Sequence, residues 1–140
     1  MKVNLALEAG MRISGTNERG MKTLFDTNAD NHSATFASPM EIMLESLGAC
    51  STLDVISILR KQRRTITDFR VDIEAERAEE HPKVFVSAHV IYTLTSPDAT
   101  LNELTRAVEL SQEKYCSASA MFIRSGCEIT YEAVIISPNN

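Results

Sequence analysis

Three cysteines are the residues of this chain best suited to chemistry, and two of them lie in segments with helical spacing of apolar residues. Cys50 lies within the apolar segment 39–59, and Cys116 lies where two shorter helical segments meet. Two thiols on adjoining helices can form a peroxide-reducing pair, because one attacks the oxidant and the other resolves the product as a disulfide. A single thiol in an apolar helix is more often inert packing, so the interpretation depends on the pair.

The surroundings of each thiol suggest how it would behave. Cys116 is expected at the N-terminal end of a short helix over 117–125. Free N–H groups and the positive end of the helix dipole would favour the thiolate there and lower the pKa of the thiol. Cys127 falls on the apolar face of a predicted strand over 127–136, and we interpret it as a core residue.

Composition limits the classes of protein to which the chain can belong. It has 140 residues, 44% of them apolar and 24% charged, with a formal net charge of −5. This size and composition predict a single globular domain over 1–140. The negative charge disfavours a nucleic-acid partner. The basic run 60–64 ends a predicted helix, where its positive charges complement the carbonyl end of the helix dipole; this interpretation is favoured over a phosphate or partner site.

The targeting features of the sequence and the number and spacing of its cysteines indicate a reducing compartment. No stretch approaches the roughly 18 consecutive apolar residues of a membrane span, and the N-terminus lacks the form of a secretory signal. An odd number of widely spaced cysteines without a CxxC pair disfavours a disulfide framework and a structural zinc site. We therefore expect a cytoplasmic protein with no membrane partner.

The elements that must position the thiols follow from periodicity. Strands are expected at 2–8, 11–15, 21–26, 67–77, 83–95 and 127–136. Helices are expected from 39 to about 63, from Ser96-Pro97-Asp98 to about Tyr115, and over 117–125. The inner faces of the two long strands are predicted to carry Phe69, Val71, Ile73 and Ala75, and Val84, Val86, Ala88, Val90 and Tyr92. Clustered hairpins with helices between them predict an α+β fold with a largely antiparallel sheet.

The helix that carries Cys50 has the clearest signals. Ser38 suits the N-cap, Pro39 the first helical position, and Glu41 completes a capping box. A glycine inside a helix, such as Gly48, lowers the stability of the helix by about 1 kcal/mol relative to alanine. We therefore expect a packing or functional reason for Gly48. The helix is apolar around much of its circumference, which predicts a buried central element, and a homodimer is a plausible way to cover it.

Two segments of the chain carry a family resemblance. SPMEIMLESLGACS and the later EKYCSA, with the strand order around them, resemble the OsmC/Ohr family of organic hydroperoxide reductases, and the OsmC-like branch more closely. The resemblance covers essentially the whole chain. It implies an OsmC-like intertwined α+β homodimer with active sites at the protomer interface and with no metal or organic cofactor.

The resemblance also implies roles for both thiols. Cys50 would be the peroxidatic residue and become a sulfenic acid, and Cys116 would condense with it to a disulfide. A dithiol such as a lipoyl group would then reduce that disulfide. Organic hydroperoxides are expected to be preferred over hydrogen peroxide because the surroundings of the thiols are apolar, with Met40, Met43, Leu47, Met121 and Phe122.

The sequence departs from the better-known members at the acidic position. Those enzymes carry a glutamate directly after the proline that opens the cysteine helix, where this chain has Met40, and Glu41 follows one place later. On an ideal helix of about 100° per residue, Glu41 would lie roughly opposite Cys50. A capping role for Glu41 is therefore favoured over a supporting role in the active site.

The family's thiolate-stabilising arginine is the second departure. The N-terminal candidates are Arg12 and Arg19, and Arg19 is interpreted as a solvated turn residue. His32 could approach the cysteine helix from its loop, although a solvated histidine is the simpler interpretation. Asp54 lies one turn after Cys50, where an ionised carboxylate would raise the pKa of the thiol or make a hydrogen bond at the edge of the core.

Two other functions remain open on the sequence alone. A non-catalytic binding module could hold a small hydrophobic ligand in the same apolar cleft, with the cysteines as packing. A cysteine redox sensor could use the disulfide as a switch. Turnover of a hydroperoxide with a dithiol reductant separates the peroxidase from both.

Overall fold

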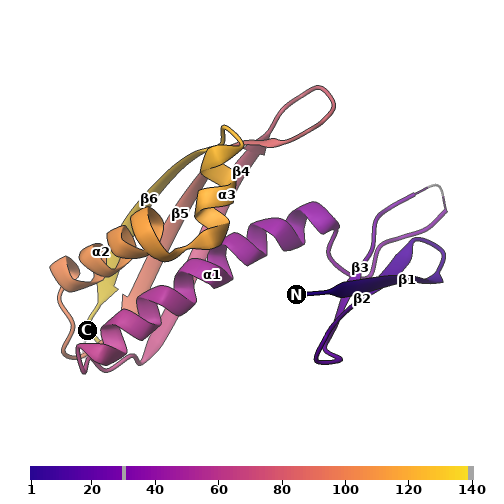
Figure 1. Cartoon of the computed structure of the whole chain (residues 1–140). Coiled ribbons are helices and arrows are strands. Elements are labelled where there is room, and N and C mark those ends of the chain that lie inside the picture. The colour runs from indigo at the N-terminus through magenta and orange to yellow at the C-terminus, as the bar shows by residue number, and fades with distance from the viewer. Residues whose placement is uncertain (30, 139–140) are drawn as a thin grey trace. The chain divides into compact units, whose positions relative to one another are not determined.

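A computed structural model describes residues 1–29 and 31–138 and divides the chain into two compact units, 1–45 and 46–140. Helix α1 (Pro39–Lys61) begins in the first unit and continues through the second (Figure 1). The elements are α+β, with a three-stranded sheet in each unit. The expectation of one domain over the whole chain stays a prediction.

The N-terminal unit is an antiparallel sheet of three short strands. They are β1 (Val3–Ala9), β2 (Arg12–Asn17) and β3 (Lys22–Phe25), in the order β1-β2-β3. Each lies within a few residues of its predicted range. Gly10 makes the turn between β1 and β2 with φ of 58°, a left-handed conformation that glycine adopts at little cost.

The loop after β3 is organised by the buried carboxylate of Asp26. It accepts hydrogen bonds from the N–H groups of Thr35 (3.0 Å) and Thr27 (2.9 Å), and its Oδ1 lies 2.6 Å from His32 Nε2. The Thr35 N–H above all, with His32 and the Thr27 N–H, lowers the pKa of Asp26 to about 2 against the opposing effect of burial. His32 is thus a partner of Asp26 within this unit.

The C-terminal unit packs helices on one face of a second sheet (Figure 1). The strands are β4 (Asp68–Arg77), β5 (Phe85–Thr95) and β6 (Glu128–Ile136), in the order β4-β5-β6. After α1, the helical segments are α2 (Leu101–Leu110), the π-helical turn η1 (Ser111–Tyr115) and α3 (Ser117–Arg124). The pairing of β4 with β5 is antiparallel, whereas β5 and β6 are parallel, because the helical crossover returns the chain in the same direction.

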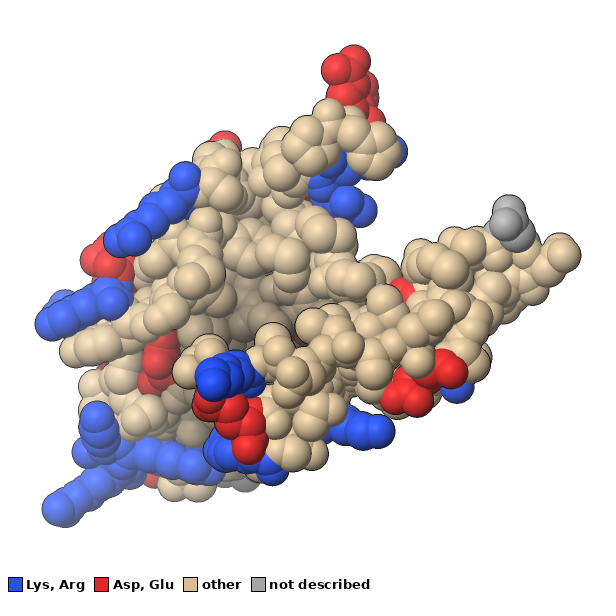
Figure 2. Space-filling view, turned by 45° about the vertical axis from the view of Figure 1, so that its right-hand side comes forward, with Lys and Arg blue, Asp and Glu red and all other residues tan. Residues whose placement is uncertain are grey.

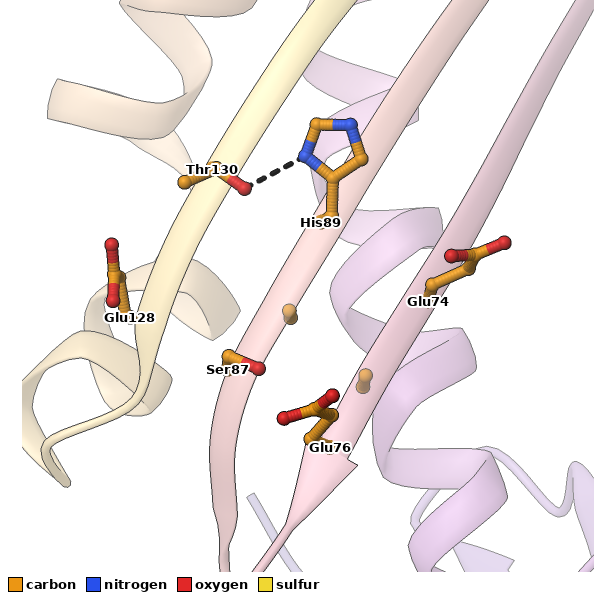
Figure 3. Close-up of a pocket in the computed structure, with 8 residues that line it drawn as sticks. Glu74, Glu76, Ser87, His89, Glu128 and Thr130 are labelled. Carbon is orange, nitrogen blue, oxygen red and sulfur yellow. Dashed lines mark hydrogen bonds between the residues drawn. The ribbon is translucent and has the colours of Figure 1, made fainter.

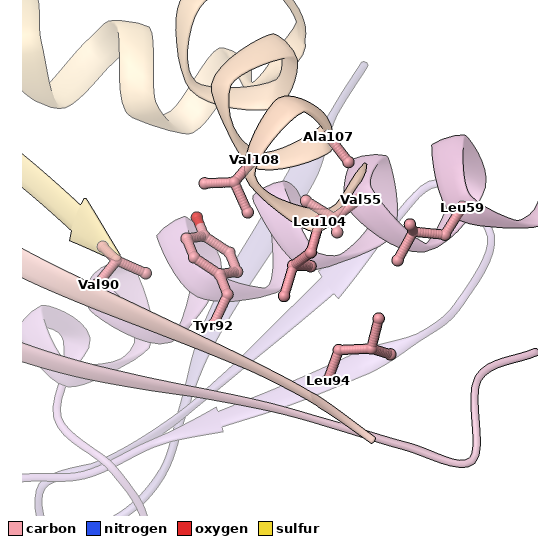
Figure 4. Packing of buried hydrophobic residues seen from close by; sticks show 8 residues of the cluster. All are labelled: Val55, Leu59, Val90, Tyr92, Leu94, Leu104, Ala107 and Val108. Atoms are coloured by element: carbon pink, nitrogen blue, oxygen red, sulfur yellow. The ribbon is translucent and has the colours of Figure 1, made fainter. Parts of the chain in front are cut away.

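The core of this unit lies between the sheet and helices α1 and α2 (Figure 4). Its members are at most 1% exposed: Val55 and Leu59 of α1, Val90, Tyr92 and Leu94 of β5, and Leu104, Ala107 and Val108 of α2. Full burial of one large apolar side chain contributes about 1.5–3 kcal/mol, so this cluster is the main reason that the helices stay on the sheet. Around it pack predicted inner residues of β4, including Phe69 and Val71, together with residues of β6 such as Ile129.

The predicted inner face of β5 is wrong at its beginning. Val84 lies before the strand and Val86 is 41% exposed, whereas Phe85 is buried. The pairing shifts here, from Arg77 with Phe85 to Glu76 with Ser87, which leaves Val86 as an extra residue. Such a bulge reverses the alternation of side chains, and from Ala88 onward the prediction is confirmed.

The predicted start of the second helix is also wrong. The helix begins at Leu101 with Thr100 as N-cap, and Thr100 and Glu103 form a capping box. Ser96 forms a turn instead, in which its Oγ accepts the N–H of Ala99 at 3.0 Å. The capping box satisfies the first free N–H groups of the helix better than Ser96 would.

Within the single chain, helix α1 fully buries one stripe and leaves the rest of its surface partly or fully exposed. Leu47, Val55 and Leu59 are fully buried, whereas Leu53 is 69% exposed. Gly48 has the expected packing reason, because a Cβ there would lie 2.9 Å from Ile73 Cδ1 of β4. Among the described residues, α1 is the one helix long and apolar enough to cross a membrane, a criterion that the central helix of a globular unit also meets.

Candidate active site

The fold brings the two predicted thiols together with a carboxylate. The sulfur atoms of Cys50 and Cys116 and one carboxylate oxygen of Asp54 all lie within 4.8 Å of one another. Cys50 and Asp54 are partly exposed and Cys116 is buried. Both thiols are free. The sequence placed Cys50 and Cys116 on separate helices, and the tertiary structure makes them neighbours.

Cys116 is positioned by the junction between η1 and α3. Its backbone N–H donates to the carbonyl of Ser111 at 2.7 Å, which closes the π-helical turn. Its sulfur then caps α3 by accepting the N–H of Ser119 at 3.3 Å. A π-helical turn holds one residue more than an α-helical turn, and such turns often occur at functional sites. Here the turn separates α2 from α3 and leaves Cys116 at the helix N-terminus.

A buried chain of hydrogen bonds links the elements that carry the thiols. The Tyr92 hydroxyl of β5 donates to Ser51 Oγ of α1 at 2.7 Å and accepts from Gln112 Nε2 of η1 at 2.6 Å. Ser51 Oγ in turn lies 3.1 Å from the carbonyl oxygen of Gly48, to which it donates. Burial raises the pKa of Tyr92, against hydrogen bonds from Ser51 and Gln112 that lower it, so the hydroxyl keeps its proton.

Asp54 is held in place by a hydroxyl from the opposite element. Ser111 Oγ donates to Asp54 Oδ2 at 3.0 Å. The predicted hydrogen bond at the edge of the core is therefore present, and the carboxylate also neighbours both sulfur atoms. Ser111 itself is fully buried, so the hydroxyl gives Asp54 a fixed orientation toward the thiols.

The two thiols differ in their access to solvent, and burial also changes the acidity of Cys116. Cys116 is 3% exposed, and this burial raises the pKa of its thiol above the ordinary value. The hydrogen bond from the Ser119 backbone N–H lowers it, and the neighbouring Cys50 thiol raises it further. The predicted lowering of the Cys116 pKa is therefore wrong, because desolvation outweighs the N-terminus of an eight-residue helix.

Glu41 occupies its capping box. Its carboxylate accepts the N–H of Ser38 at 2.7 Å, and its own N–H donates to Ser38 Oγ at 3.3 Å. The Ser38 N–H lowers the pKa of Glu41. This confirms the capping geometry, which occupies the carboxylate at the start of α1.

The N-terminal arginines have partners within their own unit. Arg12 Nη2 donates to Thr35 Oγ1 at 2.8 Å, and the Arg12 guanidinium lies 4.9 Å from the centre of the Phe36 ring. The backbone N–H of Arg19 donates to Asn17 Oδ1 at 2.9 Å, as expected for a turn residue. Arg12 therefore braces the loop that leads to α1.

Cys127 is separate from the thiol pair. It is 3% exposed, and burial raises the pKa of its thiol. It precedes β6 directly, and its burial confirms the interpretation as a core residue. This makes Cys127 a natural internal control for experiments on the other two.

Sequence reasoning missed the polar residues that surround the pair. Ser51, Ser111 and Ser119 are fully buried, and Gln112 is 7% exposed. A signal was present in the sequence, because Ser51 stands between Leu47 and Val55 in the apolar stripe of α1. A buried hydroxyl requires partners, so its position on that stripe indicated a polar network.

A hollow lies on the face of the sheet that the helices leave open (Figure 3). Acidic and hydroxyl side chains line it, with His89 among them: Glu74, Glu76, Ser87, Glu128 and Thr130. His89 Nδ1 lies 2.7 Å from Thr130 Oγ1. The thiol pair belongs to the helical side of the same sheet, so this hollow is a separate surface feature.

Known proteins resemble this chain over nearly its full length. A model of the OsmC-like protein family matches residues 31–132. Protein YhfA of Escherichia coli K12 is 33% identical over 137 residues, which cover 98% of this chain and 99% of that protein. A hypothetical protein from Aquifex aeolicus VF5 has a crystal structure with a TM-score of 0.80 and 29% identity, covering 96% of both chains.

A more distant structure extends the likeness in fold. It is the organic hydroperoxide resistance protein OhrB of Bacillus subtilis, with a TM-score of 0.61 and 18% identity, covering 94% of this chain and 96% of that one. The fold is thus the α+β architecture that OsmC and Ohr proteins share. The chain belongs to the OsmC-like protein family.

The buried hydrogen-bond chain makes a first prediction. In Tyr92→Phe, the Gln112 Nε2 donor loses its acceptor while staying buried. An unsatisfied buried donor costs about 1–3 kcal/mol, so the free energy of unfolding measured in urea should fall by that amount. Tyr115→Phe is the matched control, because Tyr115 is 52% exposed and its loss of a hydroxyl should change stability little. Equal effects of the two variants would contradict the role given to Tyr92.

Proposed function

We propose that the protein is a thiol-dependent peroxidase that reduces organic hydroperoxides through Cys50 and Cys116. The observation that carries the proposal is the pair of sulfur atoms within 4.8 Å, one partly exposed and the other buried. Membership of the OsmC-like family and the fold shared with an organic hydroperoxide resistance protein support a redox role in general terms.

The first step uses the more accessible thiol. The Cys50 thiolate attacks one peroxide oxygen, a sulfur–oxygen bond forms and the oxygen–oxygen bond breaks. Cys50 becomes a sulfenic acid, and the other oxygen takes a proton and leaves as the alcohol. Partial exposure suits Cys50 to meet a substrate, whereas Cys116 is 3% exposed.

The second step uses the buried thiol. Cys116 attacks the Cys50 sulfur, a disulfide forms and the hydroxyl group leaves as water. An external dithiol, such as a lipoyl group, then reduces the disulfide and is itself oxidised to a disulfide. Shielding from solvent suits the resolving role, because Cys116 needs to reach only its neighbour. Glu41 supports the site indirectly, by capping the helix that carries Cys50.

An apolar environment supports the choice of organic hydroperoxides. Leu47, three residues before Cys50, and Phe122, on α3 behind Cys116, are buried, and Met121 beside Phe122 is 73% exposed. On the face shown in Figure 2, the side chains of Lys, Arg, Asp and Glu lie mainly toward the edges. The alkyl group of an organic hydroperoxide gains from contact with apolar side chains such as Leu47, Phe122 and Met121, and hydrogen peroxide has no alkyl group.

We also propose that the active protein is a homodimer. Each unit exposes large apolar side chains: Val3, Leu5 and Leu7 on β1 at 63–70%, and Leu53, Met121 and Ile123 in the C-terminal unit at 50–73%. Monomeric proteins rarely leave such surfaces open. A second copy would cover them through a self-complementary interface.

Enzyme activity is tested by the consumption of an alkyl hydroperoxide with a lipoyl dithiol as reductant, in metal-free buffer. We expect turnover by the wild type and by Cys127→Ser, and a fall to the uncatalysed rate in Cys50→Ser, because the attacking sulfur is absent. If the wild type turns over hydroperoxide no faster than Cys50→Ser does, the result would contradict the peroxidase function and favour a binding module.

The division of roles between the thiols makes a separate prediction. One equivalent of hydroperoxide should produce a single Cys50–Cys116 disulfide and leave Cys127 reduced. Cys116→Ser should accumulate sulfenic acid on Cys50 and over-oxidise, because no second thiol traps the intermediate. Peptide mapping by mass spectrometry measures both results, and a disulfide that contains Cys127 would show the assignment to be wrong. Stoichiometric disulfide without catalytic turnover would instead favour a redox sensor.

The oligomeric state is measured by light scattering of the purified protein. We expect twice the chain mass of 15.5 kDa at micromolar concentration, because dimerisation removes the exposed apolar surface from water. Leu53→Glu should shift the protein toward the monomer, whereas Asn102→Glu, at an exposed position on α2, is the control for an added surface charge. A monomeric wild type would contradict the proposal.

A further inference from the structure

The thiol pair and its carboxylate have the composition of a metal site. We propose that, in the reduced protein, Cys50, Cys116 and Asp54 bind a divalent ion such as Zn²⁺ with a fourth position left open. The three ligand atoms lie within 4.8 Å of one another and come from two separate segments of the chain. Metal binding itself does not depend on the peroxidase activity proposed above.

The ligand set determines which ion is favoured. Thiolates select zinc and other thiophilic ions over magnesium or calcium, and a carboxylate is an accepted third ligand of zinc. With Zn–S of about 2.3 Å and Zn–O of about 2.0 Å, donors on one tetrahedral ion lie roughly 3.5 Å apart. Small rotations of the side chains would bring the present atoms to that separation.

Groups outside the ligands already hold two of them in place. Ser111 Oγ donates to Asp54 Oδ2, which leaves the other carboxylate oxygen for the ion. The Cys116 sulfur accepts the N–H of Ser119. The Ser119 hydroxyl is fully buried and makes no hydrogen bond among the described residues, so it is available to donate to a metal-bound thiolate. Such outer partners orient ligands and tune affinity.

The site has one open side. Cys50 and Asp54 are partly exposed, whereas Cys116 is buried, so an ion can approach from the side of α1. Three protein ligands with a vacant fourth position is the arrangement of zinc sites that exchange a ligand, whereas purely structural sites have four. We therefore expect water or a small anion in the fourth position.

Metal binding and the disulfide are mutually exclusive states of the same two sulfur atoms. If the proposed peroxidase is correct, a hydroperoxide oxidises the two thiolates to a disulfide, is itself reduced to alcohol and water with uptake of two protons, and the ion is released. A bound ion in turn shields Cys50 from the peroxide. This consequence rests on the proposed function.

Cobalt(II) is the spectroscopic probe that tests the site. The full-length reduced protein is titrated with Co²⁺ under a phosphine reductant, which avoids competing thiols. We expect one ion per chain, with a thiolate-to-cobalt charge-transfer band and the intense visible bands of tetrahedral cobalt. Added Zn²⁺ should abolish both. In a parallel titration without the phosphine, which would reduce a disulfide, prior formation of the Cys50–Cys116 disulfide should prevent both.

Variants separate this site from adventitious binding. Cys50→Ser and Cys116→Ser should each lose charge-transfer intensity, while Cys127→Ser retains it. Ser111→Ala should weaken the affinity about 10–100-fold, and Asp54→Asn, which keeps the hydrogen bond from Ser111, should weaken it further. The exposed Asp72→Asn on β4 is its control.

The outcomes are distinct from those of the peroxidase assay. Absence of the charge-transfer band in the folded wild type, its persistence in Cys50→Ser, or its loss in Cys127→Ser would overturn the metal site. Circular dichroism of each variant establishes that it is folded, and Asp54→Asn and Ser111→Ala test the site even if Cys116→Ser does not fold. If the wild type reduces hydroperoxide but binds no metal, the metal site is wrong. If it binds the metal but does not reduce hydroperoxide, the proposed peroxidase function is wrong.

Discussion

The hydrogen bonds of the buried Tyr92 hydroxyl are the constraint on which the rest of the site depends. Tyr92 lies on the central strand β5, and its hydroxyl joins Ser51 of α1 to Gln112 of η1. Ser51 directly follows Cys50, and Gln112 is four residues before Cys116. The sheet therefore sets the separation between the two thiols. Because a buried polar group without partners is costly, the network favours one arrangement of these elements.

The same arrangement makes the thiols unequal. The π-helical turn and the capping of α3 place Cys116 in the interior, where burial raises the pKa of its thiol. Cys50 lies on a helix that buries only one stripe, so its sulfur is partly exposed. The difference in solvent access thus follows from packing: Cys50 lies within α1, and Cys116 lies at the junction of η1 and α3. A pair with one accessible and one shielded sulfur is suited to sequential chemistry.

The polar neighbours of the thiols within the C-terminal unit are a carboxylate and hydroxyl-bearing residues. Asp54 lies next to both sulfur atoms and accepts a hydrogen bond from Ser111, and the N–H of Ser119 donates to the Cys116 sulfur. Glu41, two residues after the helix-opening proline, is occupied by its capping box, and Arg12 contacts Thr35 and Phe36. Hydrogen-bonding groups of this kind can serve thiolate chemistry and metal ligation alike, which is why both proposals concern one cluster.

The sequence by itself determined the order of the elements, the α+β class, the capped helix around Cys50 and the family. These depend on local signals: the alternation in β4 and β6, and the capping residues Ser38 and Glu41. It could not place Val86, because a bulge reverses the alternation without a local signal. It also could not give the acidity of Cys116, because desolvation depends on which elements cover the sulfur. Only the tertiary structure brought Cys50, Asp54 and Cys116 together, since the contacts between α1, β5 and η1 join segments far apart in the chain.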